Sequence, residues 1–160
     1  MGILGEYRAK RRDERELGQG LWRRARDRFR RGLDRFHQVL EQIQDRELQA
    51  AAVTTANELA DLLPRVHGIC VAAQALAPTD GQDIPGSEGG WLNDLHRELS
   101  RAGNDLAQAA EALALARFRT PGVDPTVARG QRLDAVARRA ATVAEHVDRA
   151  ELMLFQHGSR

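Results

Sequence analysis

The sequence predicts an all-α protein, an up-down-up-down four-helix bundle preceded by a basic N-terminal arm. The first observation is a regular apolar repeat from Trp91 to Phe118, in which leucine alternates with mostly alanine at steps of three and four residues. This period is typical of a helix that partner helices bury along one seam. The second is a composition rich in alanine with only 4% aromatic residues, which suits closely packed helices. The repeat consists of Leu92, Leu95, Leu99, Ala102, Leu106, Ala109, Leu113 and Ala116.

Length and composition limit the class of protein. The 160 residues are enough for one domain with one core. The single cysteine, Cys70, excludes an internal disulfide and fits a reducing compartment. No apolar run approaches the ~20 residues that a membrane-spanning helix needs, and the N-terminus lacks the apolar core of a secretory signal. We therefore expect a cytoplasmic protein.

Residues 1–20 are expected to form a helical but mobile N-terminal arm. Ile3, Leu4 and Tyr7 give the arm a small apolar patch, after which basic and acidic residues follow. No apolar stripe continues along it far enough to dock it firmly on other helices. A Gly-Gln-Gly segment at residues 18–20 then interrupts the helix.

Residues 21–157 are expected to form the bundle, with a first helix over about 21–44 and a second over about 46–77. The only boundary signal between these two helices is Asp45, a fair N-cap. Two alternatives are open. Either the chain turns near Asp45, or one helix continues as a long rod whose unburied seam requires a homodimer partner. Length favours the turn, because the four helices then have similar lengths.

The remaining boundaries are marked by proline and glycine. Pro64 removes a backbone donor and is expected to kink the second helix. The loop 78–90 is rich in proline and glycine and precedes the third helix, at about 90–118. Asp124 is expected to cap the fourth helix, at about 125–156. The predicted inward positions of the second helix are Leu48, Ala52, Thr55, Leu59, Leu62, Val66, Ile69, Ala73 and Leu76.

The sequence contains no catalytic motif, and we predict no catalytic residues, no metal ligands and no cofactor. His67 and Cys70 lie one turn apart, but no second cysteine or orienting carboxylate follows at a suitable spacing. Asp34, His37 and Glu41 come nearest to the Glu-x-x-His pattern of di-iron bundles. The position of the apolar seam turns both carboxylates outward.

His96 and His146 flank the predicted seams of the third and fourth helices. The predicted inward positions hold no carboxylates, and their only polar residue is Thr55. An enzyme or small-ligand binder, with a site in the bundle core or under the loop 78–90, is therefore the third interpretation of the sequence.

The uneven distribution of charge is the property that points most clearly to a function. The net charge is only +1, but residues 1–36 carry twelve basic and six acidic side chains. We expect a non-enzymatic interaction or scaffold protein that presents the arm to an acidic protein partner or to an anionic membrane surface, peripheral to the inner leaflet. The residues expected to make this contact are Ile3, Leu4, Tyr7, Arg8, Lys10, Arg11, Arg12 and Arg15.

Two other interpretations of the basic region are open. One is a solvated surface without a partner, neutralised in part by nearby acidic residues such as Asp13, Glu14 and Glu16. The other is sequence-independent nucleic-acid binding by the first bundle helix. The residues that would contact nucleic acid are Arg23, Arg24, Arg28, Arg30, Arg31 and Arg35.

Overall fold

The computed structural model describes residues 2–119 and 121–158, and within these residues every regular element is helical. The predicted all-α class is therefore confirmed. A short 3₁₀ turn, η1, precedes α4. The elements are α1 (Ile3–Leu17), α2 (Leu21–Gln42), α3 (Arg46–Leu76), η1 (Glu88–Gly90), α4 (Trp91–Leu115) and α5 (Pro125–His157).

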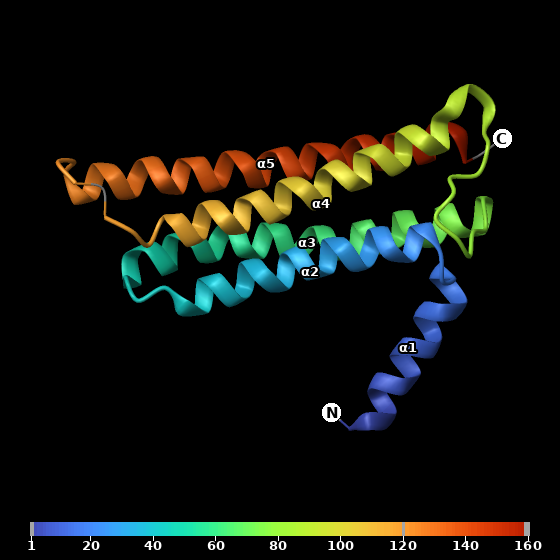
Figure 1. The fold of residues 1–160 in the computed structure, drawn as a ribbon, viewed down its shortest axis with the longest axis horizontal. Coiled ribbons are helices and arrows are strands. Elements are labelled where there is room, and N and C mark those ends of the chain that lie inside the picture. Colours follow the sequence, from blue (N-terminus) through green and yellow to red (C-terminus); the bar gives the residue numbers. More distant parts are fainter. Residues whose placement is uncertain (1, 120, 159–160) are drawn as a thin grey trace.

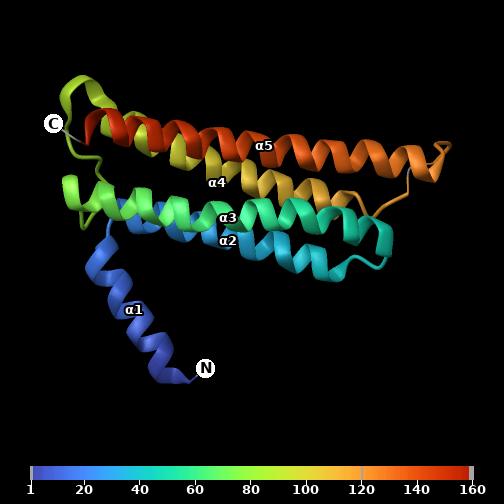
Figure 2. The same ribbon diagram turned by 180° about the vertical axis from the view of Figure 1, so that it is seen from behind.

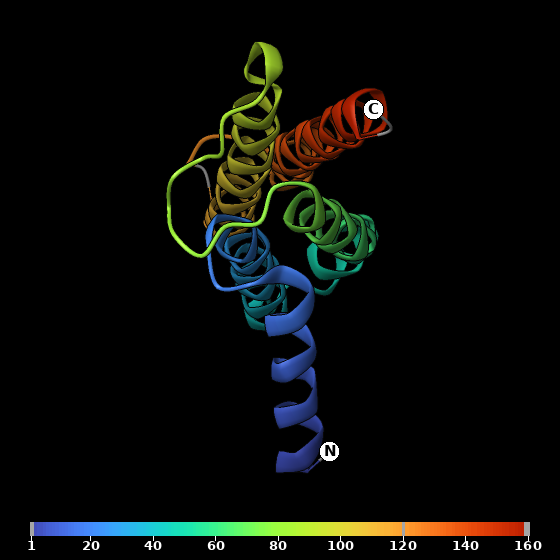
Figure 3. The ribbon, with the colours of Figure 1, turned by 90° about the vertical axis from the view of Figure 1, so that its right-hand side faces the viewer.

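The four long helices, α2 to α5, lie side by side along the long axis of the molecule, and consecutive helices run in opposite directions (Figures 1 and 2). Helix α2 packs against α3 and α4, and α5 packs against the same two helices. Helix α1 leaves one end of this group and projects away from it (Figure 3). Its own contacts are with α2 and α3.

Helix α4 supplies the most regular part of the core. All eight members of the leucine–alanine repeat are buried, with at most 4% of their surface exposed. Trp22, Phe29 and Phe36 of α2 and Val143 of α5 are also buried, in the same core. Burial of a single leucine contributes about 1.5–3 kcal/mol, so this repeat is the main source of stability for α4.

The chain turns between α2 and α3, so the structure does not contain the single long rod. Asp45 is the N-cap of α3, and its carboxylate accepts hydrogen bonds from the backbone N–H groups of Glu47 and Leu48 at 3.1 and 3.2 Å. Arg129 of α5 also donates to Asp45, with an Nη2–Oδ2 distance of 2.8 Å. The hydrogen bond from Leu48, followed by that from Arg129, holds the pKa of Asp45 below its ordinary value.

Helix α3 includes Pro64, as the expected bounds of the second helix did, and this proline is exposed. Several other local details differ from the sequence-based expectations. Ala56 is buried in place of its neighbour Thr55, and Leu76 is 48% exposed at the helix end. Helix α4 ends at Leu115, three residues earlier than expected, because the chain enters a series of turns there. The turn that leads to α5 includes residue 120, which lies outside the described residues.

Candidate functional site

Helix α1 presents apolar and basic side chains to solvent. Ile3, Leu4 and Tyr7 are 85%, 73% and 54% exposed. Four arginines at spacings of three and four residues share one face of the helix, together with Leu4, Tyr7 and one acidic residue, Glu16. This basic strip, Arg8, Arg11, Arg12 and Arg15, borders an open hollow of about 640 Å³. Lys10 is also exposed but does not line the hollow.

The acidic side chains of α1 contact the helices behind it. An oxygen of Asp13 lies 2.6 Å from Nη2 of Arg26, which is itself buried. Glu14 lies 4.0 Å from Arg23, and Glu16 lies 3.3 Å from Nε2 of His67.

The basic strip makes no ion pair with the described residues. No carboxylate oxygen among them lies within 4.0 Å of the five basic side chains of α1, while three of the four acidic residues of this helix have partners on α2 or α3. The guanidinium of Arg11 instead lies over the Tyr7 ring, 5.1 Å from its centroid.

The base of α1 is anchored, in contrast to the rest of the helix. Leu17 is completely buried. Gly18 has a φ of +65°, a conformation that favours glycine. A Cβ at Gly20 would lie 2.4 Å from the carbonyl oxygen of Thr79, so only glycine fits there. The direction in which α1 leaves the other helices is thus set by close contact with the chain that follows α3.

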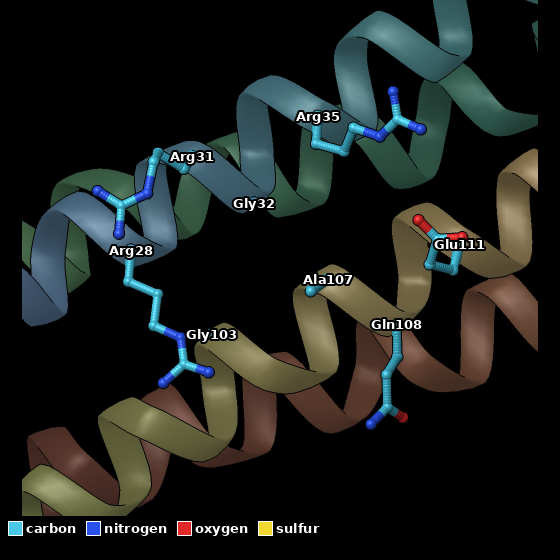
Figure 4. Close-up of a pocket in the computed structure, with 8 residues that line it drawn as sticks. All are labelled: Arg28, Arg31, Gly32, Arg35, Gly103, Ala107, Gln108 and Glu111. Carbon is cyan, nitrogen blue, oxygen red and sulfur yellow. The ribbon is translucent and has the colours of Figure 1, made fainter.

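The six arginines of α2 predicted as nucleic-acid contacts lie on two faces of the helix: the spacing places Arg24 with the three that line a groove, and Arg23 and Arg30 on another face. Arg23 is engaged with Glu14 and with Asp27 at 3.7 Å. Arg24 and Arg30 are exposed outside any described hollow. The other three line a groove of about 460 Å³ between α2 and α4, drawn in Figure 4. The residues of this α2/α4 groove are Arg28, Arg31, Gly32 and Arg35 of α2 and Gly103, Ala107, Gln108 and Glu111 of α4.

Cys70 lacks the environment of a nucleophile. The side chain is completely buried, and its burial raises the pKa of the thiol to about 12. The neighbouring His67 contacts Glu16 of α1. The thiol is therefore protonated at neutral pH and serves to fill the core.

A buried polar cluster joins α4 and α5, and the sequence-based reasoning missed it. Glu98 and His146 are only 6% and 8% exposed. Nδ1 of His146 lies 2.6 Å from Oε2 of Glu98, and Nε2 lies 3.0 Å from Oδ2 of Asp105. The expectation that inward positions hold no carboxylates was therefore wrong. The sequence did contain a signal for this cluster: Glu98 and Asp105 are seven residues apart, so both lie on the same side of the α4 seam.

This cluster has the geometry of a structural contact. The two carboxylates lie on opposite sides of the imidazole ring, so the three groups do not converge on one point. In the described part of the chain, no three His, Cys, Asp or Glu side chains are arranged to hold a metal ion.

His96, the other histidine expected beside a seam, packs edge-on against the ring of Trp22, with the ring centroids 6.2 Å apart. Burial of the imidazole, together with the nearby charge of Arg28, lowers the pKa of His96.

A third hollow lies beside the loop that follows α3. It has a volume of about 750 Å³ and is lined by segments 76–78 and 85–89, together with Trp91, Leu92 and His157. Trp91 and His157 stack there, with ring centroids 5.0 Å apart. The polar side chains at this hollow, Ser87, Glu88 and His157, show no arrangement typical of a catalytic site.

Comparison with known proteins assigns no family: no protein-family model, no curated protein and no solved structure matches the chain. Among the described helices, none is both long and apolar enough to cross a lipid bilayer.

Proposed function

We propose that the protein is a non-enzymatic scaffold whose helix α1 binds an anionic membrane surface. The observation that carries the proposal is the separation of charge on α1. Its acidic residues Asp13, Glu14 and Glu16 contact α2 and α3, whereas the basic strip and three apolar side chains face solvent. The ion pairs of the acidic residues hold α1 to its neighbours, but they do not account for a solvent-facing basic strip beside three exposed apolar side chains.

The two kinds of exposed side chain suit the two layers of a membrane surface. Ile3, Leu4 and Tyr7 would enter the boundary between headgroups and acyl chains, while the arginines remain among the phosphates. Each basic residue near an anionic leaflet contributes about 1 kcal/mol. In this proposal, α2 to α5 act as an up-down-up-down four-helix bundle, α1 acts as its basic arm, and the protein is peripheral to the inner leaflet.

Flotation with lipid vesicles tests this function. The full-length protein is mixed at physiological salt with vesicles of phosphatidylcholine alone or with added phosphatidylserine. We expect flotation only with the anionic vesicles. Replacing all four arginines of the basic strip by glutamine should weaken binding by about two to three orders of magnitude.

The matched control is the exposed pair Arg24→Gln and Arg30→Gln on α2, which should leave flotation close to that of the unaltered protein. A separate variant, Ile3→Ser with Leu4→Ser, should also weaken binding, because the apolar contribution is lost. Equal flotation of all variants, or none with the unaltered protein, would show that α1 does not bind membranes. The acidic protein partner would then become the leading candidate for α1.

Sequence-independent nucleic-acid binding is a second candidate function. It is supported by Arg24, Arg31 and Arg35, which have no carboxylate oxygen within 4.0 Å among the described residues. It is weakened by the ion pairs of Arg23 and by the lack of aromatic side chains along this face for base stacking. Affinity for an oligonucleotide that falls steeply with salt, and that does not change when the basic strip is replaced, would favour it.

A further inference from the structure

We propose that the α2/α4 groove is a second binding surface, independent of α1, that receives an acidic amphipathic helix of a partner protein. Helix α1 contacts α2 and α3 and projects away from the four long helices (Figures 1 and 3), so it does not cover the residues of the α2/α4 groove. The protein would then join a membrane surface to a protein partner.

The floor of the groove allows close approach of another helix. A Cβ at Gly32 would lie only 3.1 Å from Cγ of Leu106, so α2 and α4 come close together at this point. Beside this contact, the exposed Ala107 carries only a methyl group. At Gly103 the side chain of Arg28 covers the floor, since its Cγ and Cδ lie 3.5 Å from where a Cβ of that buried glycine would be. Small residues on the surface of two neighbouring helices leave a depression into which the ridge of a third helix fits.

The rim of the groove is charged mainly on one side. Arg28, Arg31 and Arg35 follow one another at spacings of three and four residues along α2 (Figure 4). Arg28 reaches across the groove and donates a hydrogen bond to Oδ1 of Asn104 on α4. Glu111 is the one acidic residue that lines the groove, so its lining is basic overall.

This pattern of charge matches carboxylates presented by a helix. The three arginines extend over about two turns, and acidic residues repeated at three and four positions lie along one helix face with the same spacing. Planar guanidinium groups bind carboxylates in a bidentate manner. Among the described residues no carboxylate lies within 4.0 Å of Arg31 or Arg35, so both are available to a partner. No aromatic side chain lines the groove, which does not suit nucleic-acid bases.

The probe for this proposal is a fluorescent peptide of about five helical turns. It carries glutamates at positions i, i+3 and i+7 beside an alanine face, and its binding to the full-length protein is followed by fluorescence anisotropy. Two control peptides are compared: one with glutamine in place of glutamate, and one with the same glutamates distributed around the helix. We expect the facial acidic peptide to bind more tightly than both.

Protein variants separate the groove from general attraction to anions. Arg31→Glu with Arg35→Glu should weaken peptide binding by about tenfold or more, because like charges then face each other. The matched variant Arg46→Glu with Arg138→Glu reverses two exposed charges on α3 and α5, outside the groove, and should change affinity by less than about twofold. Ala107→Gln should also weaken binding, since it fills the exposed floor without altering charge. Circular dichroism shows whether each variant remains folded.

Three results would overturn the proposal. One is the absence of peptide binding, and another is equal binding of the facial and redistributed peptides. The third is an equal effect of the two charge-reversal variants. A single-stranded oligonucleotide that binds more tightly than the peptide and is unaffected by Ala107→Gln would assign the groove to nucleic acid instead. Flotation of Arg31→Glu with Arg35→Glu on anionic vesicles should remain normal, which separates this proposal from that for α1.

Discussion

Helices α1 and α4 are stabilised in different ways. Eleven of the 25 residues of α4 are buried, whereas Leu17 is the one buried residue among the 15 of α1, all of which lie in the described part of the chain. Burial of apolar surface therefore accounts for the stability of α4 but not for that of α1. The basic strip also places like charges at spacings of three and four residues, which costs a few tenths of a kcal/mol per pair. Stability alone does not explain this composition, whereas the proposed binding to an anionic surface would.

Two groups of arginines also differ: one forms short ion pairs between helices, and the other forms none with described residues. Arg26, Arg65 and Arg129 each connect two helices through ion pairs shorter than 3.0 Å: Arg26 with Asp13, Arg65 with Asp148 and Arg129 with Asp45. Those of the basic strip make no such contacts with described residues. Paired arginines hold helices together, and the unpaired arginines of α1 mark the surface proposed for binding.

Truncation of a core leucine should have the largest effect. Leu106→Ala removes a fully buried side chain from the repeat of α4, and we expect a loss of about 2–5 kcal/mol in the free energy of unfolding. Urea denaturation followed by circular dichroism measures it. Leu115→Ala on the same helix, at a position 64% exposed, should lose less than about 1 kcal/mol. Similar losses for the two variants would contradict the description of the seam.

Removal of the buried carboxylate of α4 should have the next largest effect. Glu98→Ala leaves His146 without its partner at 2.6 Å, and we expect a loss of about 1–3 kcal/mol. The exposed Glu111→Ala on the same helix is the control. Combining Glu98→Ala with His146→Ala should cost less than the sum of the two single changes, because the residues share one contact. Additive losses would show that the cluster contributes nothing as a pair.

Loss of the contact between α1 and α2 should have a smaller effect. Asp13→Ala removes the partner of the buried Arg26, although Arg26 retains Asp27 at 3.0 Å, and we expect a loss of about 1 kcal/mol. Hydrogen exchange of the α1 amides should become faster. Glu6→Ala, an exposed acidic residue of α1, should change neither quantity. Unchanged exchange in Asp13→Ala would mean that this ion pair does not hold α1.

The four-arginine replacement of the basic strip should have the smallest effect on stability. We expect the free energy of unfolding to change by no more than about 0.5 kcal/mol, since all four side chains are exposed. A loss above about 1 kcal/mol in urea denaturation would instead assign these arginines a structural role. It would also remove the main reason for assigning them a binding role.

Much of the core could be predicted from the sequence because its signal is periodic. The repeat of α4 identified eight buried residues, and a single N-cap, Asp45, marked the turn between α2 and α3. Helix ends such as Gln42 and Leu115 were less well predicted, since they depend on local turns that leave little pattern. The prediction that Leu76 of α3 points inward was wrong, because the helix ends there and the neighbouring helices no longer cover this side chain.

The candidate sites depended on tertiary contacts and were only partly predictable. The composition of α1 indicated its basic and apolar residues, but the contacts of Asp13 and Glu16 with other helices decide whether the basic strip is neutralised. The cluster of Glu98 and His146 joins residues 48 positions apart. The α2/α4 groove likewise requires Gly32 and Gly103 to lie on adjacent helices, and the local sequence does not indicate which helices are adjacent.

The close fit of Gly20 against Thr79 has a consequence for orientation. A protein held on a flexible linker turns freely above the surface to which it binds, and its other surfaces point in all directions. Here the junction between α1 and α2 has no room for even one additional carbon atom, and Nε1 of Trp22 donates to the carbonyl oxygen of Ala77 at 3.1 Å beside it. Binding through α1 would therefore fix the tilt of the long axis, and with it the direction in which any cargo is presented.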